Sequence, residues 1–354
     1  MRILLIIKNF NLGGAENHLC DLANSLHSKG NQVFVVGRSG KQQNKLAPGI
    51  TFIHLPLNSF NTTFNLLRLR ALIAKHKIEI IHAHQRHAIF LASLAGMWSK
   101  TPVVATIHGR SQYDLRSWIA RKYIGKFIFV SQYVMKASIR FPEIQQRIIL
   151  IPNGISIQKR KDTTRNQTVS YISRIDEKHY EVLHLMINEV LPRLHADFPN
   201  LAFRIIGEGN FLQQVKGEAL RLNRNFGKEI CTIMGYQPEV AAFICDSALV
   251  MGVGRVALES LSCGVPVLSV NKNRMGAVIS SENYAFYKEN NFVAVDHNPP
   301  NGGELYRQLS DFFSNQNHFS KETEIVSERI EDDFDWNKIV ARIEAIYREL
   351  IQEN

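Results

Sequence analysis

The sequence predicts an α/β protein made of two Rossmann-like domains in tandem, followed by a C-terminal helix. Three observations support this. Short apolar runs alternate with helical patterns along the chain, its 354 residues suit two domains of about 150 residues each, and the alternation pauses once, at the polar stretch 155–170. Apolar strands that alternate with helices are typical of a parallel sheet covered on both faces.

The first half contains apolar runs that indicate the strands of one sheet. They lie at residues 3–7, 32–37, 50–56, 78–84, 102–108, 126–131 and 147–154. The amphipathic stretch 15–30 separates the first two runs and ends at Gly30, a residue typical of a helix C-terminus. The first domain is therefore expected over residues 1–155.

The second half repeats this pattern and ends in an amphipathic helix. Its expected strands lie at residues 168–174, 201–209, 229–235, 247–252, 265–270 and 291–295. We expect the second domain over 156–334 and a separate helical segment over 335–354. One face of the helix 336–350 carries Ile339, Val340, Ile343, Ile346, Tyr347 and Leu350. This helix either completes the second domain or crosses back to the first.

The composition is that of a soluble globular protein. Apolar residues make up 45% and charged residues 21% of the chain. No apolar run has the roughly 18 residues of a transmembrane helix, and the apolar start is too short for a secretory signal. The four cysteines, Cys20, Cys231, Cys245 and Cys263, are scattered, so neither a disulfide framework nor a zinc site is indicated. We therefore expect a cytoplasmic protein.

The charge is distributed unevenly between the two halves. Residues 1–150 contain 20 Lys and Arg against 5 Asp and Glu, whereas the remainder is mildly acidic. A basic half favours an anionic partner, either nucleic acid or a membrane surface, although a solvated basic face is the simpler alternative. Nucleic acid is disfavoured because the basic residues are not interleaved with aromatic residues in a recognisable module.

Two stretches could bind an anion where a strand ends. Gly13 and Gly14 precede a helix, so backbone N–H groups and the positive end of the helix dipole face the loop. Arg174 and Lys178 follow an expected strand of the second domain, and two cations four residues apart can hold a diphosphate. The glycine pair alone is a weak signal, because a plain turn also explains it.

A third stretch could bind a ribose. After the strand 247–252, a turn through Gly254 leads into a helix that carries Glu259. A carboxylate in this place can accept hydrogen bonds from ribose hydroxyls, or it can simply complement the helix N-terminus.

The histidines His82, His84, His87 and His108 cluster at strand ends in the first domain. No carboxylate or cysteine lies near them in the sequence, so we expect no metal there. His108 is the better candidate for a substrate contact, because Gly109 beside it permits close approach.

The chain resembles the retaining glycosyltransferases of family 4, which have the two-domain GT-B fold. The resemblance is carried, in order, by GGAENHLCDLANSL, IEIIHAHQ, TPVVATIHG, FIFVSQYV, ILIPNGIS, YISRIDEKH, FRIIGEGN and ALESLSCGVPVLS. It implies two Rossmann-like domains facing a central cleft, with the C-terminal helix crossing back to the N-terminal domain. It also implies transfer of a sugar from a nucleotide-sugar with retention of configuration and without a metal or other cofactor.

The resemblance assigns roles to particular residues. Arg174 and Lys178 would stabilise the leaving diphosphate, and His108 would lie beside the transferred sugar. The first domain would bind the acceptor, and Glu259 would bind the ribose of the donor. The remaining donor-binding positions would be Gly13, Gly14, Gly207, Gly209, Gly235, Gly254 and Arg255.

The chain departs from the family pattern at three points. The family usually has two glutamates eight positions apart, and the first of them, beside the sugar, corresponds here to Met251. Arg255 is new in the following turn and could reach the diphosphate or an acidic sugar. Ser173 and His179 stand where glycine is usual. We interpret the chain as an altered branch of the family whose donor pocket has lost a carboxylate.

The basic first half suits a family whose acceptors are often lipid-linked. Arg68, Arg70, Lys75 and Lys77 lie among leucines in 66–77, a plausible interfacial helix, and Arg110, Arg116, Arg121 and Lys122 extend the patch. We therefore expect a hexosyltransferase, peripheral at the inner face of the cell membrane. It would act on a glycan or lipid-linked acceptor in polysaccharide or lipopolysaccharide synthesis.

Two alternatives remain open. A non-catalytic nucleotide-sugar-binding or scaffold protein is suggested by Met251. A nucleotide-sugar 2-epimerase would need carboxylates for proton transfer, for which the first half offers only Glu16 and Asp114 as plausible groups. The sequence does not identify the sugar, the base or the acceptor, although a uridine nucleotide is the family's most frequent choice.

Overall fold

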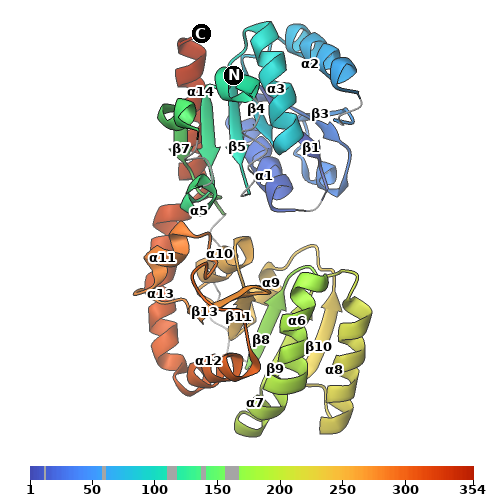
Figure 1. Cartoon of the computed structure of the whole chain (residues 1–354), viewed down its shortest axis with the longest axis vertical. Helices are drawn as coiled ribbons and strands as arrows, with labels where there is room; N and C mark the ends of the chain where they lie inside the picture. The colour runs from blue at the N-terminus through green and yellow to red at the C-terminus, as the bar shows by residue number, and fades with distance from the viewer. Residues whose placement is uncertain (12, 58–60, 110–117, 137–140, 156–166) are drawn as a thin grey trace. The chain divides into compact units, whose positions relative to one another are not determined.

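The computed structural model describes residues 1–11, 13–57, 61–109, 118–136, 141–155 and 167–354. The chain divides into two compact units, unit 1 with Met1–Gly154 and Trp336–Asn354, and unit 2 with Ile155–Asp335. Each unit has its own sheet and its own helices (Figure 1). The predicted α/β class with two Rossmann-like domains is confirmed. Most of the predicted polar connection, 155–170, lies outside the described residues.

Unit 1 is built on a seven-stranded sheet in the order β3-β2-β1-β4-β5-β6-β7. The strands are β1 (Arg2–Asn9), β2 (Gln32–Arg38), β3 (Thr51–His54), β4 (Ile80–His84), β5 (Val103–Ile107), β6 (Lys126–Phe129) and β7 (Ile148–Leu150). Every neighbouring pair is parallel. The chain builds outward from β1 on one side and then continues from β4 on the other, so the topology switches between β1 and β4.

Helices cover both faces of this sheet. They are α1 (Gly14–Ser28), α2 (Thr62–His76), α3 (Arg86–Ser99), α4 (Trp118–Tyr123), α5 (Gln132–Lys136) and α14 (Trp336–Gln352), with the 3-10 turns η1 (Lys41–Lys45) and η3 (Pro142–Arg147). Along β1, Leu4 and Ile6 belong to one buried cluster, whereas Ile3, Leu5 and Ile7 belong to the other. This alternation is the period of two that a strand imposes. It lets one apolar run contribute to both faces.

The C-terminal helix α14 contributes to the core of unit 1. The six apolar residues that the sequence places on one of its faces, from Ile339 to Leu350, are all buried. They share a cluster with residues of α1, β1 and β2. The helix therefore packs on the same face of the sheet as α1.

Unit 2 is built on a six-stranded sheet in the order β10-β9-β8-β11-β12-β13. Its strands are β8 (Thr168–Ile172), β9 (Ala202–Ile206), β10 (Cys231–Gly235), β11 (Leu249–Gly252), β12 (Val267–Asn271) and β13 (Arg274–Val278). Its helices are α6 (Glu177–Leu185), the π-helical η4 (Met186–Val190), α7 (Leu191–Asp197), α8 (Leu212–Phe226), α9 (Ala241–Cys245), α10 (Arg255–Ser262), α11 (Tyr284–Glu289), α12 (Gly302–Ser314) and α13 (Gln316–Phe334). The topology again switches once, between β8 and β11.

The predicted strand at 291–295 is wrong. Asn291 and Phe292 have φ angles of 54° and 59°, in the left-handed region that a strand does not use. The last strand is instead β13, which pairs antiparallel with β12. The side-chain oxygen of Asn271 accepts hydrogen bonds from the backbone of Asn273 and Arg274 and so closes the tight turn between them. The apolar run 291–295 reflects burial of Phe292 and Ala294 in a loop.

Within the described residues, no helix combines the length and the apolar character needed to cross a lipid bilayer.

Candidate functional site

Each unit has one edge where functional side chains gather. In an open parallel sheet, the carboxyl ends of the strands beside the topological switch form the usual ligand-binding place. In unit 1 these ends belong to β1, β4 and β5, and in unit 2 to β8 and β11. We call them the histidine edge and the cation edge.

The histidine edge begins at Gly13 and Gly14, where α1 starts. A Cβ atom on Gly13 would lie 2.3 Å from a carboxylate oxygen of Glu16, so the close approach of this carboxylate requires glycine. Glu16 Oε1 accepts a hydrogen bond of 2.7 Å from Gln85 Nε2. The Gln85 amide oxygen in turn accepts one from the Asn9 backbone N–H at 3.3 Å. This network connects the loop after β4 to the end of β1 and to the start of α1.

Gln85 has a backbone conformation that side chains other than glycine rarely adopt. Its φ of 68° lies in the left-handed region, immediately after β4 and before α3. Such strain costs roughly 1–3 kcal/mol and persists where the surroundings over-determine the residue, often at functional sites. Here the hydrogen bonds to Asn9 and Glu16 hold it.

Three histidines from three different elements lie together at this edge. His18 belongs to α1, His84 ends β4, and His108 follows β5 directly. The Nδ1 atom of His84 lies 2.9 Å from Nε2 of His108. The His18 ring lies 5.7 Å from the His84 ring and 5.0 Å from the His108 ring, measured between centroids. His18 and His84 are buried, and His108 is half-buried.

Burial keeps the imidazoles of His84 and His108 neutral at physiological pH. It lowers the pKa of His108 to about 4. It also holds the pKa of His84 well below the ordinary value, and repulsion from His82, His108 and His18 adds to this effect. A neutral imidazole has one lone pair; the hydrogen bond between His84 and His108 uses that of the accepting ring, and the donating ring keeps its own.

His82 differs from its neighbours because both of its ring nitrogens are bonded. Nδ1 lies 2.5 Å from the Tyr347 hydroxyl of α14, and Nε2 lies 2.7 Å from the Thr106 hydroxyl. Burial lowers the pKa of His82 to about 3, with a smaller contribution from His108. His82 therefore joins α14 to the sheet as part of the core. His87, the fourth histidine of the predicted cluster, lies on α3 and is half-buried.

The cation edge of unit 2 presents Arg174 and Lys178 to solvent, since both side chains are exposed. They flank Asp176, whose carboxylate accepts a hydrogen bond of 3.0 Å from the Lys178 backbone N–H and caps α6. The cap fixes the spacing of the two cations just beyond β8, which is a suitable arrangement for binding an anion.

Ser173 and His179, the two departures from glycine, interact with each other. The Ser173 hydroxyl lies 3.0 Å from Nδ1 of His179, and the Tyr171 hydroxyl lies 2.9 Å from the same nitrogen. Burial lowers the pKa of His179, and the negative charge of Asp176 partly offsets this shift. The pair thus ties the start of α6 to the end of β8, beneath the two cations.

Two glycines of this edge are required by backbone packing. A Cβ atom on Gly207 would lie 1.8 Å from the Ser173 carbonyl oxygen, and one on Gly209 would lie 2.1 Å from the Ile175 carbonyl oxygen. The turn after β9 therefore packs directly on the turn after β8. Gly235, at the end of β10, has a φ of 67° and is required by its conformation.

The start of α10 carries an ion pair. Gly254 caps the helix with a φ of 62°, which favours glycine. Arg255 Nε donates to Glu259 Oε1 at 2.7 Å, and both side chains are about one-third exposed. Arg255 thus contacts Glu259, one turn along the helix.

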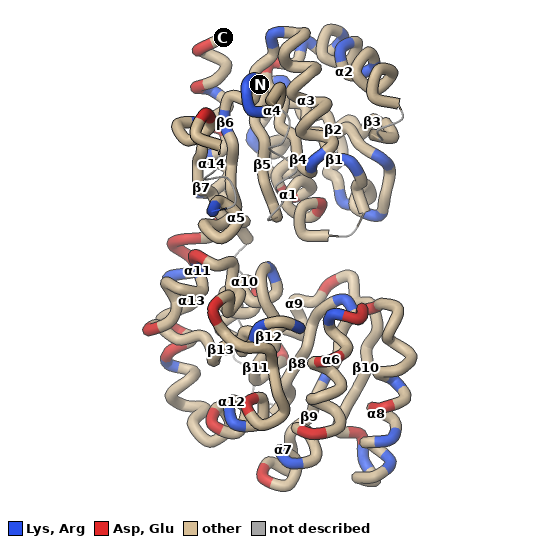
Figure 2. The backbone as a smooth tube through the Cα atoms, in the orientation of Figure 1, with Lys and Arg blue, Asp and Glu red and all other residues tan. Residues whose placement is uncertain are grey.

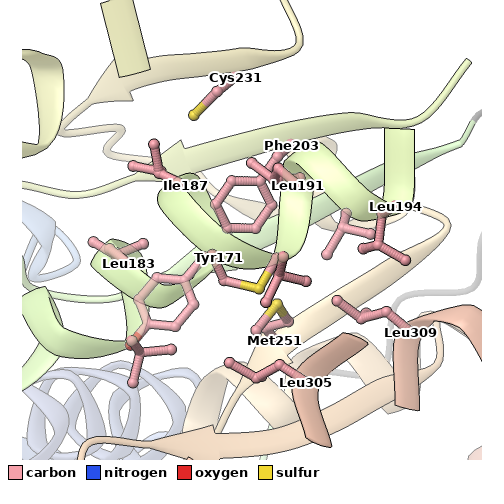
Figure 3. Close-up of a cluster of buried hydrophobic side chains, with 14 of the residues drawn as sticks. Tyr171, Leu183, Ile187, Leu191, Leu194, Phe203, Cys231, Met251, Leu305 and Leu309 are labelled. Atoms are coloured by element: carbon pink, nitrogen blue, oxygen red, sulfur yellow. The ribbon is translucent and has the colours of Figure 1, made fainter. Parts of the chain in front are cut away.

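Met251 has a different environment from the one that the sequence comparison predicts. It lies within β11, inside the expected strand 247–252, and its exposed fraction is zero. Figure 3 shows its side chain in a buried cluster that also contains Tyr171 and Leu305. The interpretation of Met251 as part of a donor pocket is therefore wrong. Strand alternation directs Leu249 and Met251 to this cluster and Val250 to the opposite one.

The predicted patch residues on α2 and at its end, Arg68, Arg70, Lys75 and Lys77, are exposed. Figure 2 marks basic positions along α2 in blue. Arg68 stacks over Phe64 at 5.2 Å, and Arg70 stacks over Trp98 of α3 at 5.1 Å. The exposed large apolar side chains on these two helices are Phe64, Leu67, Met97 and Trp98. Arg110, Asp114 and Arg116 lie outside the described residues.

Two residues of the histidine edge, His18 and Gln85, were not predicted from the sequence. His18 falls on the apolar face of α1, where a helical period marks it only as a core position. Gln85 could have been noticed because it follows the end of β4, at the edge where ligands bind. Neither stands in a recognisable motif of its own.

Comparison with known proteins agrees with this organisation. The family model of Glycosyltransferase Family 4 matches residues 12–159, and that of Glycosyl transferases group 1 matches residues 166–301. The chain is 22% identical to the gpi3 subunit of phosphatidylinositol N-acetylglucosaminyltransferase from Schizosaccharomyces pombe, over 97% of this chain and 79% of that protein. It is also 22% identical to phosphatidyl-myo-inositol mannosyltransferase of Mycolicibacterium smegmatis, over 95% of this chain and 90% of that protein.

Solved structures show the same fold. HepE of Anabaena in complex with UDP superimposes with a TM-score of 0.78 at 18% identity, over 99% of this chain and all of that one. Sucrose-phosphate synthase of Thermosynechococcus elongatus gives 0.73 at 15% identity, over the full length of both chains. With two Rossmann-like units of this type and matching family models over both, the chain belongs to glycosyltransferase family 4 and has the GT-B fold.

Proposed function

We propose that the protein transfers a hexose from a uridine diphosphate sugar to a lipid-linked or glycan acceptor, with retention of configuration. The observation that carries this proposal is the cation edge, where Arg174 and Lys178 are exposed beside the strand switch of unit 2. Departure of a nucleoside diphosphate develops negative charge, and fixed cations aimed at that charge are usually the largest catalytic contribution.

The two cations have complementary roles in this proposal. The planar guanidinium of Arg174 can bind two phosphate oxygens at once, and the Lys178 ammonium acts as a point charge. Together they supply the charge that a metal supplies in other transferases, so the reaction needs no metal or other cofactor. Glu259 accepts hydrogen bonds from the ribose hydroxyls, and neutral His108 lies beside the transferred sugar. The glycines of both edges let the donor approach the backbone.

The donor assignment draws on a solved relative. HepE of Anabaena was crystallised with UDP, with UDP and glucose, and with UDP-glucose. The retained fold makes the same class of donor the first to test. Retention of configuration is what the family resemblance implies, and the anomeric signal of the product in an NMR spectrum would test it.

The acceptor assignment draws on the names of two relatives and on the surface of unit 1. Both relatives are named for transfer to phosphatidylinositol. Arginines on α2 lie among exposed aromatic and apolar side chains, a combination suited to anionic headgroups and to the acyl boundary. We therefore propose peripheral binding at the inner face of the cell membrane, and a role in surface polysaccharide or lipopolysaccharide synthesis. Nucleic acid is not a proposed partner.

The two alternatives now have less support. Met251 motivated the non-catalytic reading, but it is a core residue and says nothing about the donor pocket. Of the two carboxylates that the epimerase reading would use, Glu16 accepts a hydrogen bond from Gln85, and Asp114 lies outside the described residues.

Thermal unfolding against a panel of nucleotides and nucleotide-sugars tests the donor. A ligand that binds only the folded protein raises the unfolding midpoint by mass action. We expect UDP and one UDP-sugar to raise it and guanosine and adenosine diphosphates to leave it unchanged.

Charge variants then locate the site. Arg174→Ala and Lys178→Ala should each weaken UDP binding at least about tenfold, because each removes a charge-assisted contact to phosphate. Arg224→Ala, which removes an exposed arginine from α8, is the matched control and should bind UDP as the wild type does. If both edge variants bind UDP normally, the proposed donor site is wrong.

A further inference from the structure

The three clustered histidines of unit 1 form a candidate metal site. One ring nitrogen of each of His18, His84 and His108 lies within 4.8 Å of those of the other two. The residues come from α1, from the end of β4 and from the position after β5. The edge of the sheet therefore brings them together from positions that are far apart in the sequence.

The distances suit a tetrahedral ion after a small adjustment. Zinc binds imidazole nitrogen at about 2.0–2.1 Å, so two nitrogens on one tetrahedral ion lie roughly 3.4 Å apart. The closest nitrogens of His84 and His108 are 2.9 Å apart. A nitrogen of His18 lies within 4.8 Å of the ligand nitrogens of both other rings.

The hydrogen bonding of the cluster is incomplete. Nε2 of His84 and Nδ1 of His108 are buried and have no hydrogen-bond partner among the described residues. One N–H···N bond between two neutral imidazoles leaves an N–H on one outer nitrogen and a lone pair on the other. A buried unsatisfied polar group costs about 1–3 kcal/mol. His82, only two residues from His84, has both ring nitrogens hydrogen-bonded, so the two neighbours differ in this respect.

The donor set selects the kind of ion. The cluster offers imidazole nitrogen, and neutral imidazoles bind zinc, copper, nickel and iron readily, whereas magnesium and calcium prefer oxygen ligands. Three protein ligands leave the fourth position open, and half-buried His108 gives access to it.

We propose that His18, His84 and His108 together bind one divalent transition-metal ion of the zinc class. This inference does not rest on the proposed transfer reaction, for which no metal is needed. An ion at this place would lie beside the glycine pair that begins α1.

Direct binding of zinc to the full chain, prepared without a polyhistidine tag, tests the proposal. Equilibrium dialysis followed by metal analysis should find one equivalent of Zn²⁺ on the wild type and no retained Mg²⁺. His18→Ala and His108→Gln should each bind Zn²⁺ at least about tenfold more weakly, because each removes a ligand. His54→Ala, which removes an exposed histidine of unit 1, is the matched control and should bind as the wild type does.

Cobalt provides a second measurement that depends on geometry. Co²⁺ in a tetrahedral nitrogen site absorbs visible light strongly, and this absorption should appear in the wild type and disappear in His18→Ala. Circular dichroism confirms that each variant is folded, and His108→Gln retains a polar side chain at a half-buried position. Failure of the wild type to bind Zn²⁺, or wild-type affinity in both folded ligand variants, would overturn the proposal.

Discussion

The two units have the same topology at their switch points but place opposite chemistry there. The histidine edge of unit 1 holds two neutral rings, buried His84 and half-buried His108, joined by a hydrogen bond of 2.9 Å. The cation edge of unit 2 holds exposed charges, Arg174 and Lys178, above a capped helix. The strand order determines where functional groups gather, whereas the residues that follow each strand determine whether they are buried and uncharged or exposed and ionised.

The largest expected effect is a loss of stability when a charge is placed at Met251, in the core of unit 2. Met251→Glu restores the carboxylate that the family usually has, but it places that carboxylate in the core. We expect a loss of at least about 4 kcal/mol in the free energy of unfolding, because the cluster offers little to pair with a buried charge. Denaturant unfolding followed by circular dichroism measures it.

Met251→Leu is the control for this substitution. It keeps the volume and the apolar character, so its cost should stay below about 1.5 kcal/mol. A stable Met251→Glu protein with faster sugar transfer would show instead that this side chain reaches the donor.

A second, smaller effect is the change in the stability of each unit as the pH falls. The pKa values of His82 and His108 fall to about 3 and about 4 in the folded chain, from about 6.5 when unfolded. The unfolded chain therefore binds protons first as the pH falls. The stability that these groups contribute is complete above pH 6.5 and is lost progressively down to about pH 4 for His108 and about pH 3 for His82. We expect unit 1 to lose about 2–5 kcal/mol between pH 7 and pH 5.

Unit 2 should respond more weakly over this interval. Burial lowers the pKa of His179 and of His195, but by less than those of His82 and His108. Burial raises the pKa of Glu218, but hydrogen bonds from Tyr180, His184 and Asn188 outweigh this effect and bring it below 4.5. The stability contributed by Glu218 is present above pH 4.5 and is lost below it. Unit 2 should therefore lose less stability than unit 1 through the range in which unit 1 weakens.

Tryptophan fluorescence separates the two responses. The three tryptophans, Trp98, Trp118 and Trp336, all belong to unit 1, whereas circular dichroism reports both units. In urea titrations with a chelator present, the fluorescence midpoint should fall between pH 7 and pH 5, ahead of the dichroism midpoint. If fluorescence and circular dichroism give equal urea midpoints at every pH, the two units do not differ in their response to acid, and the prediction is wrong.

The sequence predicts the layers well and the orientation of individual side chains poorly. Apolar runs mark most of the strands, and the face of α14 from Ile339 to Leu350 is buried as its period indicates. The run at 291–295 misleads because burial of Phe292 in a loop looks the same in sequence as burial in a strand. The strand β13 is missed because Arg274 and Gly276 interrupt its apolar character.

The candidate site is predictable only where a residue follows a strand directly. His108 follows β5 directly and Arg174 lies in the turn after β8, so both lie at the expected edges, and Lys178 follows in the first turn of α6. His18 does not meet this condition, because it reaches the cluster from a helix. The side chain of Met251 was misassigned because a spacing of eight residues from Glu259 does not reveal which face of the strand it occupies. Spacing conveys position along the chain, whereas the direction of a side chain depends on the alternation along the strand.

The smallest expected stability effect concerns the ion pair of the cation edge. Arg255 and Glu259 are one turn apart and partly exposed, so Arg255→Ala should change the free energy of unfolding by no more than about 0.5 kcal/mol. Its effect on binding is separate, because Arg255 holds the carboxylate proposed to bind ribose. In calorimetric titrations, the wild type should bind UDP more tightly than 2′,3′-dideoxy-UDP. Glu259→Gln should reduce this preference strongly and Arg255→Ala partly. If Glu259→Gln keeps the full preference, the carboxylate does not bind the ribose and merely pairs with Arg255 on the helix.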